Sequence, residues 1–277
     1  MSGTVLRFVQ VARVDRRGLA AAIFAAVGLL LLPSRAGASG KPSEAELAAI
    51  TARGQMLAEY DTAAWHATDA VMAAHPKADS SGRYIAHKTE AGWIVDFGRL
   101  NGPGDKFLVD YEAVQAGGQY TVKSFDPARE DVGWNLAAAK GIETATQDFG
   151  RTDRPYNIAA LPRTSGGMYV YLYPAQVKEG VYPLGADVRY RVSPDGTKIT
   201  EKRQLHKTII ESAPAGADVK VASGYHTHVL SDVPEDTDVL LVLTRQPRVP
   251  ELVMTPAFMY TIGVDGKITV ADRPPAK

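Results

Sequence analysis

The stretch YIAHKTEAGWIVDFGRLNGPGDKFLVDYEAVQAGGQYTVKSF, residues 84–125, decides the fold class of the N-terminal half of this chain. Apolar and polar side chains alternate along it in four runs, as they do in strands that bury one face. The runs are separated by EAG at 90–92, NGPGD at 101–105 and GG at 117–118, which are typical of hairpin turns. We therefore predict an antiparallel meander with strands at 84–88, 93–97, 107–114 and 119–125.

Helical patterns lie on both sides of the meander. Ser43 and Glu46 form a capping box, alanine is frequent after them, and His75 followed by proline ends the run, so we predict a helix over 43–74. A second helix is predicted over 127–149. Together these elements predict a small α+β unit over residues 41–150, with the helices covering one face of its sheet.

A second unit is predicted over residues 155–272, after the stretch GRTDRP at 150–155. It contains strand patterns, a helix opening at Pro234 and running through Arg245, and a terminal hairpin around Val264-Asp-Gly266. The strand patterns lie at 168–173, 188–192, 199–203, 219–228, 257–263 and 267–270. The fold class predicted for the whole chain is α+β, with a mixed α/β second unit.

The composition excludes several classes of protein. The 277 residues are 45% hydrophobic and contain no cysteine. A disulfide scaffold, a thiol nucleophile and a cysteine-ligated metal are therefore excluded. Lys+Arg and Asp+Glu both number 31, and no basic stripe with interleaved aromatic residues occurs. We therefore expect no nucleic-acid partner.

The first 38 residues have the pattern of a secretory signal peptide. Basic residues, among them Arg16 and Arg17, precede an apolar run over 19–32 and the small residues Ala36-Gly-Ala38. The run is shorter than the roughly 20 residues that a membrane-spanning helix needs. We predict cleavage after Ala38 and a periplasmic or secreted bacterial protein without a stable membrane span. The alternative is an uncleaved anchor, and the Arg16-Arg17 pair leaves both Sec and twin-arginine export open.

Two of the six histidines have a spacing that suits a metal site. His226 and His228 lie two residues apart on a predicted strand, so both rings point to one face. Acidic residues follow at 232, 235, 236 and 238. Two imidazoles with one carboxylate are a common zinc arrangement. The alternative is a pair of surface histidines beside a solvated acidic loop.

The surroundings of these histidines resemble those of the JAMM (MPN-domain) metalloprotease superfamily. The similar segments are GYHTH at 224–228, EDTD at 235–238 opening a helix, and the hairpin FMYTIGVDGKI at 258–268. The resemblance covers roughly residues 160–270 and implies a JAMM-like domain. It further implies that His226, His228 and Asp238 bind zinc and that the metal-bound water attacks an amide or peptide bond.

Three positions depart from the pattern of that superfamily. Val229 stands in place of a proline, Glu235 in place of a serine, and Thr164 in place of the glutamate that activates the water. Glu235 and Glu211 are the candidate replacements for this catalytic base. His206 is a candidate third imidazole, although the polar run 201–207 around it is more typical of an exposed surface.

Two functions follow from this pattern. The first is an exported zinc-dependent amide or peptide hydrolase of JAMM-like type. The second is a catalytically inactive JAMM-like protein that binds or scaffolds a partner in the cell envelope. Asp96 and Asp110, on the meander, are expected on its surface. Tyr169, Tyr171 and Tyr173 are expected on a strand face that the first unit covers.

Overall fold

The computed structural model describes residues 40–75, 82–212 and 221–272. The predicted signal peptide at 1–38 lies outside these residues. Within the described part of the chain, no helix is long and apolar enough to cross a membrane.

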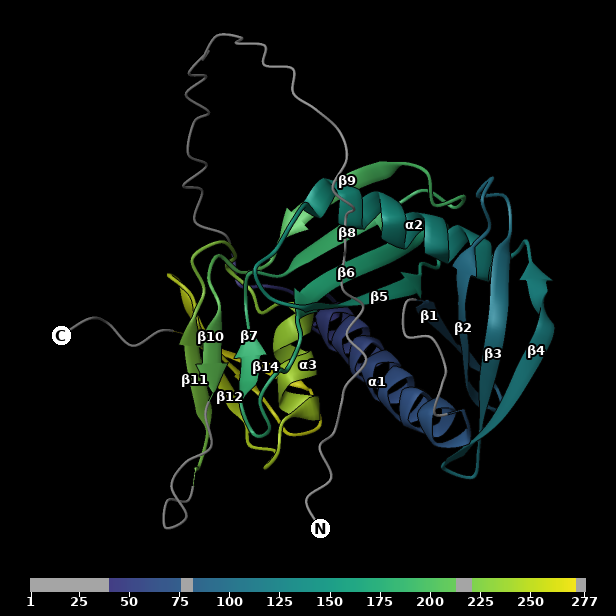
Figure 1. The fold of residues 1–277 in the computed structure, drawn as a ribbon. Coiled ribbons are helices and arrows are strands. Elements are labelled where there is room, and N and C mark those ends of the chain that lie inside the picture. Colours follow the sequence, from purple (N-terminus) through teal and green to yellow (C-terminus); the bar gives the residue numbers. More distant parts are fainter. Residues whose placement is uncertain (1–39, 76–81, 213–220, 273–277) are drawn as a thin grey trace, which may run out of the picture.

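The first sheet is the predicted meander. Its four antiparallel strands follow the chain in the order β1-β2-β3-β4 (Figure 1). The preceding helix begins at its predicted cap, where the Glu46 amide donates to Ser43 Oγ at 3.1 Å. These elements are α1 (Glu44–Ala74), β1 (Arg83–Thr89), β2 (Gly92–Leu100), β3 (Phe107–Ala116) and β4 (Gln119–Asp131).

The second helix, α2 (Trp134–Phe149), begins seven residues later than the sequence predicts. Residues 127–131 extend β4 instead, and Arg129 and Asp131 lie opposite Val109 and Phe107 of β3. A register shift in the pairing of β3 with β4, between Val109 and Tyr111, lets the pairing continue. Proline is common in the first turn of a helix, so Pro127 indicates a helix start that the structure does not have. Pairing with a long neighbouring strand decides the conformation here.

The second sheet is antiparallel, in the order β5-β6-β8-β9. Three of its strands match predicted patterns, whereas β5 and a small separate sheet of β7 and β10 were not predicted. The strands are β5 (Tyr156–Pro162), β6 (Met168–Pro174), β8 (Val188–Val192) and β9 (Ile199–Gln204), with β7 (Tyr182–Leu184) and β10 (Ile210–Ser212).

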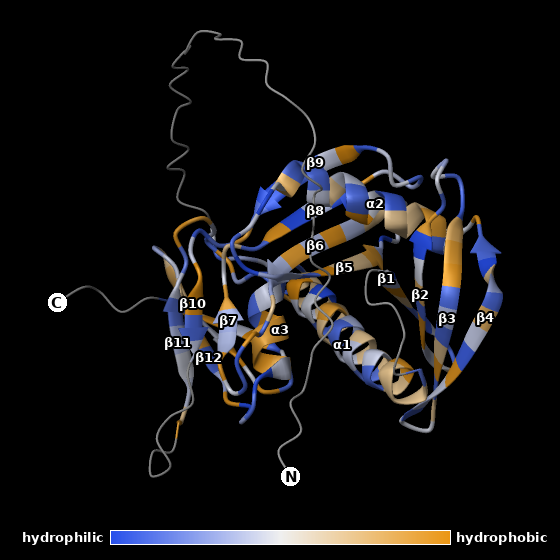
Figure 2. Ribbon diagram, viewed as in Figure 1, coloured by the Kyte–Doolittle hydropathy of each residue, from blue (hydrophilic) through white to orange (hydrophobic). Residues whose placement is uncertain are grey.

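The two long helices cover opposite faces of these sheets, which corrects the prediction that both cover one face. On β1, Tyr84 and Ala86 pack in the core that contains α1, whereas Ile85 packs in the core that contains α2. Both faces of β5 and β6 are buried in the same way, and in Figure 2 orange bands alternate with paler ones along β6. Tyr171 and Tyr173 lie on the face of β6 toward α1. The two helices thus enclose the sheets in a three-layer arrangement.

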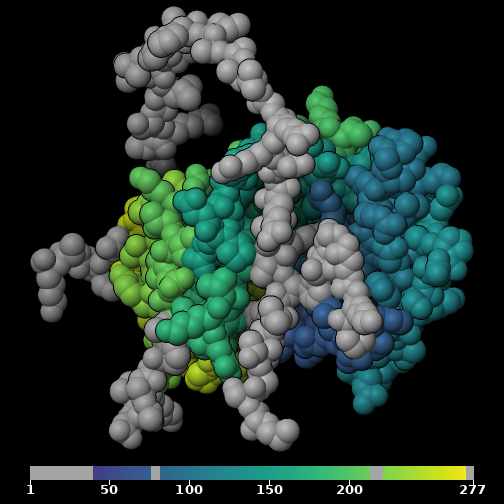
Figure 3. Space-filling model, viewed as in Figure 1, coloured from purple at the N-terminus to yellow at the C-terminus, as the bar shows by residue number. Residues whose placement is uncertain are grey.

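The third sheet lies at the other end of the molecule from the meander (Figure 3). It has the order β11-β12-β13-β14, with β11 parallel to β12 and the rest antiparallel. The start of α1 and the helix α3 pack on it through residues such as Ile50 and Val239. The elements are β11 (Gly224–Thr227), α3 (Asp236–Thr244), β12 (Glu251–Met254), β13 (Phe258–Ile262) and β14 (Ile268–Asp272).

Candidate metal centre

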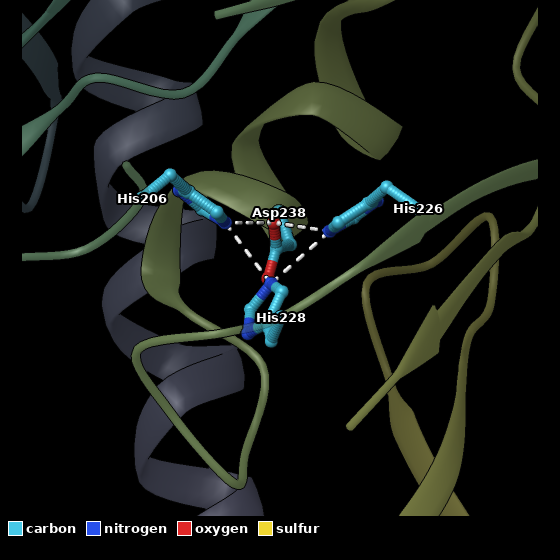
Figure 4. Close-up of side chains that lie close together, drawn as sticks. All are labelled: His206, His226, His228 and Asp238. Atoms are coloured by element: carbon cyan, nitrogen blue, oxygen red, sulfur yellow. Dashed lines mark hydrogen bonds and ion pairs between the residues drawn. The ribbon is translucent and has the colours of Figure 1, made fainter. Parts of the chain in front are cut away.

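Four buried side chains from three parts of the chain meet at one point. His206 follows β9, His226 lies on β11, His228 follows β11, and Asp238 lies in the first turn of α3 (Figure 4). None of these side chains is more than 9% exposed. One ligand atom from each lies within 4.8 Å of the others. This group could hold a metal ion.

The distances inside the cluster are those of a compact coordination shell. The Nε2 atom of His228 lies 3.0 Å from Nε2 of His206 and 3.1 Å from Nε2 of His226. The carboxylate of Asp238 lies 3.1 Å from each of the three Nε2 atoms. Zinc–nitrogen bonds of about 2.0–2.1 Å would place tetrahedral ligand atoms about 3.3 Å apart. The observed spacing therefore fits a small ion with little movement of the side chains.

The opposite nitrogen of each ring fixes its orientation. Nδ1 lies 2.8 Å from Asp187 Oδ1 in His206, 2.8 Å from Glu251 Oε1 in His226 and 3.0 Å from the Val233 carbonyl oxygen in His228. Carboxylate and carbonyl oxygens only accept hydrogen bonds, so each Nδ1 donates.

A neutral ring held in this way presents a bare Nε2 lone pair to the centre. Once the Nε2 protons are lost, three lone pairs and a carboxylate face one another and repel unless a cation lies among them. Partners of this kind on the far side of the ring are typical of metal-binding histidines.

The charges of the cluster shift its pKa values strongly. Burial lowers the pKa of His206, but the carboxylates of Asp238 and Asp187 outweigh it and raise this pKa to about 11. Burial also disfavours charged His226, yet hydrogen bonding to Asp238 and Glu251 raises its pKa to about 9. For Asp238, the positive charges of His206 and His228 outweigh burial and hold its pKa well below the usual range. Without a metal, the cluster therefore retains protons that a metal must displace.

A buried ionic network holds α3, and with it Asp238, in place. Asp236, which has no exposed surface, accepts from Arg53 Nε at 3.0 Å, Arg189 Nη1 at 2.5 Å and the Tyr171 hydroxyl at 2.8 Å. These partners lie on α1, β8 and β6. The backbone amide of Glu235 donates to Asp238 Oδ2 at 2.7 Å. The start of α3 is therefore connected to three other elements.

The two proposed bases lie in different surroundings. Glu235 is buried beside the cluster and its carboxylate binds Arg203 at 2.6 Å. Burial, opposed by Arg203, raises the pKa of Glu235 to about 6. Glu211 lies on β10 with half of its side chain exposed and pairs with Arg154 at 3.1 Å. The structure therefore brings His226, His228 and Asp238 together, with Glu235 near them, and leaves Glu211 on the surface. Thr164 lies in the exposed β5–β6 turn.

His206 is the member of the cluster whose environment the sequence predicts wrongly. The charged run 201–207 belongs mostly to the edge strand β9, whose outward residues alternate with inward ones. Beyond the strand end, Leu205 and His206 turn inward and are both buried. The supporting acids Asp187 and Glu251 were not predicted, because each stands alone at the start of a strand, without any motif spacing.

Comparison with known proteins finds no matching family model, no matching curated protein and no matching solved structure. The resemblance to the JAMM superfamily therefore stays a prediction, and the function has to be argued from the site.

Proposed function

We propose that the protein is an exported zinc-binding protein whose metal is held by four side chains and joins the second and third sheets. The observation that carries the proposal is the convergence of three Nε2 atoms and one carboxylate within 4.8 Å of one another, with both other Nε2 atoms and the carboxylate at 3.0–3.1 Å from His228 Nε2. His206 follows the second sheet, whereas His226 belongs to the third. A metal bound by both would link these sheets directly.

The donor set favours zinc among the divalent metals. Imidazole nitrogen with carboxylate oxygen in a compact four-ligand arrangement suits zinc, whereas calcium and magnesium prefer six or more oxygen ligands. The carboxylates of Asp187 and Glu251 accept hydrogen bonds from the rings of His206 and His226. They add negative charge and make these two imidazoles more basic as ligands.

The fourth ligand favours a stabilising role for the metal over a catalytic one. Catalytic zinc usually has three protein ligands and an open position, whereas structural zinc has four. His206 supplies the fourth ligand here. This supports the non-catalytic alternative for the JAMM-like region.

The test is the metal content of the protein. The full chain would be expressed in a bacterium, purified from the exported fraction and measured by mass spectrometry, which also shows whether cleavage follows Ala38. We expect one zinc per chain, lost in His206→Ala and in His226→Ala. His66→Ala is the control, because His66 is exposed and stacks on Trp65. A parent chain that takes up no zinc at neutral pH would overturn the proposal.

Hydrolysis of an amide bond is the second candidate. It is favoured by Glu235, a buried carboxyl whose pKa of about 6 suits a general base near neutral pH. The metal would supply an activated water. The two functions differ in the role of His206. A three-ligand hydrolase retains zinc in His206→Ala and loses peptidase activity in Glu235→Gln, whereas the four-ligand site loses zinc in the first variant.

A further inference from the structure

An arginine patch lies on the face of the second sheet that is turned toward α1. Tyr169 of β6 lies on this face and opposite Arg191 of β8, and cross-strand partners share a face. Arg189 lies two residues from Arg191 and opposite Arg203 of β9, so it shares this face as well. Arg53 reaches the same carboxylate as Arg189 from α1. The charged members of the arginine patch are five arginines and three acids, namely Arg53, Arg163, Arg189, Arg191, Arg203, Glu201, Glu235 and Asp236.

The charges of the arginine patch do not balance among the described residues. Asp236 has no exposed surface and accepts from both Arg53 and Arg189, so one negative charge serves two guanidiniums. Arg163 forms no ion pair with a described residue, and its Nη2 donates to Ser165 Oγ at 2.8 Å. The other acids each bind one arginine, in the pairs Arg191–Glu201 and Arg203–Glu235. The patch therefore has an excess of two positive charges, although the chain as a whole is neutral.

Two guanidiniums of the arginine patch lie against one aromatic ring. The Cζ atoms of Arg163 and Arg189 are each 5.1 Å from the centre of the Tyr169 ring. The turn after β5 fixes the backbone of Arg163, because its amide donates to the Gly167 carbonyl oxygen at 3.0 Å and its carbonyl oxygen accepts from the Gly166 amide at 3.0 Å. Like charges held at one ring repel each other, and an anion beside them relieves the repulsion. This arrangement therefore favours a negatively charged ligand.

The side chains of the arginine patch are accessible to such a ligand. Those of Arg53, Arg191 and Arg203 are 27%, 39% and 40% exposed, and Arg163 and Tyr169 are half-buried. A guanidinium can donate two parallel hydrogen bonds to a phosphate group. A phosphate monoester carries a charge of about −1.5 to −2 at neutral pH. This charge matches the excess on the patch, whereas a carboxylate or a sulfonate carries a single negative charge.

We propose that the arginine patch binds the phosphate group of a soluble phosphate monoester. Arg163 is the main contact, because Nη2 is the one atom of its guanidinium that is engaged with a described residue. Arg53, Arg191 and Arg203 add positive charge around the ligand. None of these arginines belongs to the candidate metal centre, so the proposal does not depend on zinc binding.

The test is calorimetric titration of the whole protein, purified with its metal. The probes are phenyl phosphate and benzenesulfonate, which share an aromatic ring and differ in charge. We expect saturable binding of one phenyl phosphate per chain and at least tenfold weaker binding of benzenesulfonate. Zinc itself attracts phosphate, so the titration is repeated with His206→Ala. We expect the affinity for phenyl phosphate to be unchanged in that variant.

Substitutions of Arg163 locate the binding. Arg163→Gln removes the charge, and we expect it to weaken phenyl phosphate binding at least tenfold. Arg163→Lys retains the charge but not the two parallel donors, so its affinity should lie between those of the parent and Arg163→Gln. A melting curve of each variant shows that it is folded.

The matched control, Arg99→Gln, lies on the meander. Arg99 is exposed and pairs with Asp110, outside the arginine patch, so this variant should bind phenyl phosphate as the parent does. Of the two meander aspartates expected on the surface, Asp110 is partly exposed, whereas Asp96 is 2% exposed because α2 covers that face of the sheet.

Several results would overturn the proposal. Phenyl phosphate that does not bind, or that binds no better than benzenesulfonate, contradicts a site for a doubly charged anion. Equal affinity in Arg163→Gln and Arg99→Gln excludes the arginine patch, and loss of binding in His206→Ala assigns the phosphate to the metal. Cosedimentation with phosphatidylcholine vesicles that contain phosphatidate, without binding of phenyl phosphate, assigns the patch to a lipid surface instead.

Discussion

The orientation of three imidazole rings, each fixed by a hydrogen bond from Nδ1, determines how the candidate metal centre would bind an ion. Asp187, Glu251 and the Val233 carbonyl each hold one ring. Rings held in this way are preorganised, because little side-chain entropy remains to be lost when a metal binds. The acids behind the rings therefore matter for affinity although they do not touch the ion.

Glu251→Gln tests whether an acid that holds one ring contributes to zinc affinity. Glu251 binds His226 through Oε1 and the buried guanidinium of Arg245 through Oε2, the latter at 2.6 Å. A glutamine directs its NH₂ group at one of these donors, so we expect zinc affinity to fall about 10–100-fold, as for other changes behind metal-binding histidines. Competition with a chromophoric chelator measures the zinc affinity. Glu201→Gln breaks an exposed pair with Arg191 and is the control. Equal affinity in Glu251→Gln and the parent would contradict the assigned role.

The titration of the cluster gives a second prediction, for the metal-free protein. The folded pKa values of His226, about 9, and His206, about 11, lie above that of an unfolded histidine, about 6.5. Their contribution to stability is therefore complete below about pH 6.5 and is lost as the pH rises through the folded values. Zinc requires the unprotonated rings, so its stabilising effect should grow over the same range.

Thermal melts with zinc and with a chelator, at about pH 6 and about pH 9, measure both effects. We expect the zinc-dependent rise in Tm to be larger at the higher pH, and His226→Ala to reduce this difference. A zinc effect that is independent of pH would argue against the shifted pKa values.

Among the helices, α3 packs very closely against α1. It crosses α1 at Gly54, where a Cβ atom would lie 2.4 Å from Val239 Cβ and 2.7 Å from the Asp236 carbonyl oxygen. Val239 is the neighbour of Asp238, a candidate metal ligand. The distance between the two helices therefore controls where that carboxylate lies.

Gly54→Ala should move α3 and weaken the metal site. Alanine gains about 1 kcal/mol of helix propensity over glycine, but the overlap of backbone and Cβ atoms makes the change resemble overpacking of a core, which costs about 1–3 kcal/mol. We expect a lower denaturant midpoint and weaker zinc binding. Gly102→Ala is the control, because nothing lies within 4 Å of its added Cβ. Unchanged zinc affinity in Gly54→Ala would show that α3 is not positioned by this contact.

The sequence predicts elements well where one local pattern decides them. The capped helix α1, the meander and the terminal hairpin have strong alternation or explicit turn residues, and all three are confirmed within a few residues, apart from the extension of β4 to Asp131. The start of α2 and the strands β5 and β12 depend on partners distant in the chain, which local patterns do not contain. The same holds for the metal cluster. His226, His228 and Asp238 are close in sequence, whereas His206 is brought to them only by the end of β9.

In the whole molecule, α1 belongs to two hydrophobic cores. Leu47 and Ile50 pack in the core of the third sheet, whereas residues from Leu57 to Val71 pack against the first two sheets. The core around α2 likewise joins Ile85 and Phe107 to β5, β6 and β8. All three cores thus contain residues from both sides of the predicted boundary at 150–155, and that division stays a prediction.

Shared cores predict that the described chain unfolds in one step. Calorimetry should show a single transition with equal calorimetric and van't Hoff enthalpies. Zinc should shift all of it upward, by the equivalent of about 2.7 kcal/mol at a free concentration of one hundred times Kd. His206→Ala should abolish the shift, and His66→Ala should not. Two thermal transitions would instead support separate units over 41–150 and 155–272, if only the transition at the higher temperature responds to zinc. In that case the metal would stabilise the second unit alone, because all four ligands lie within it.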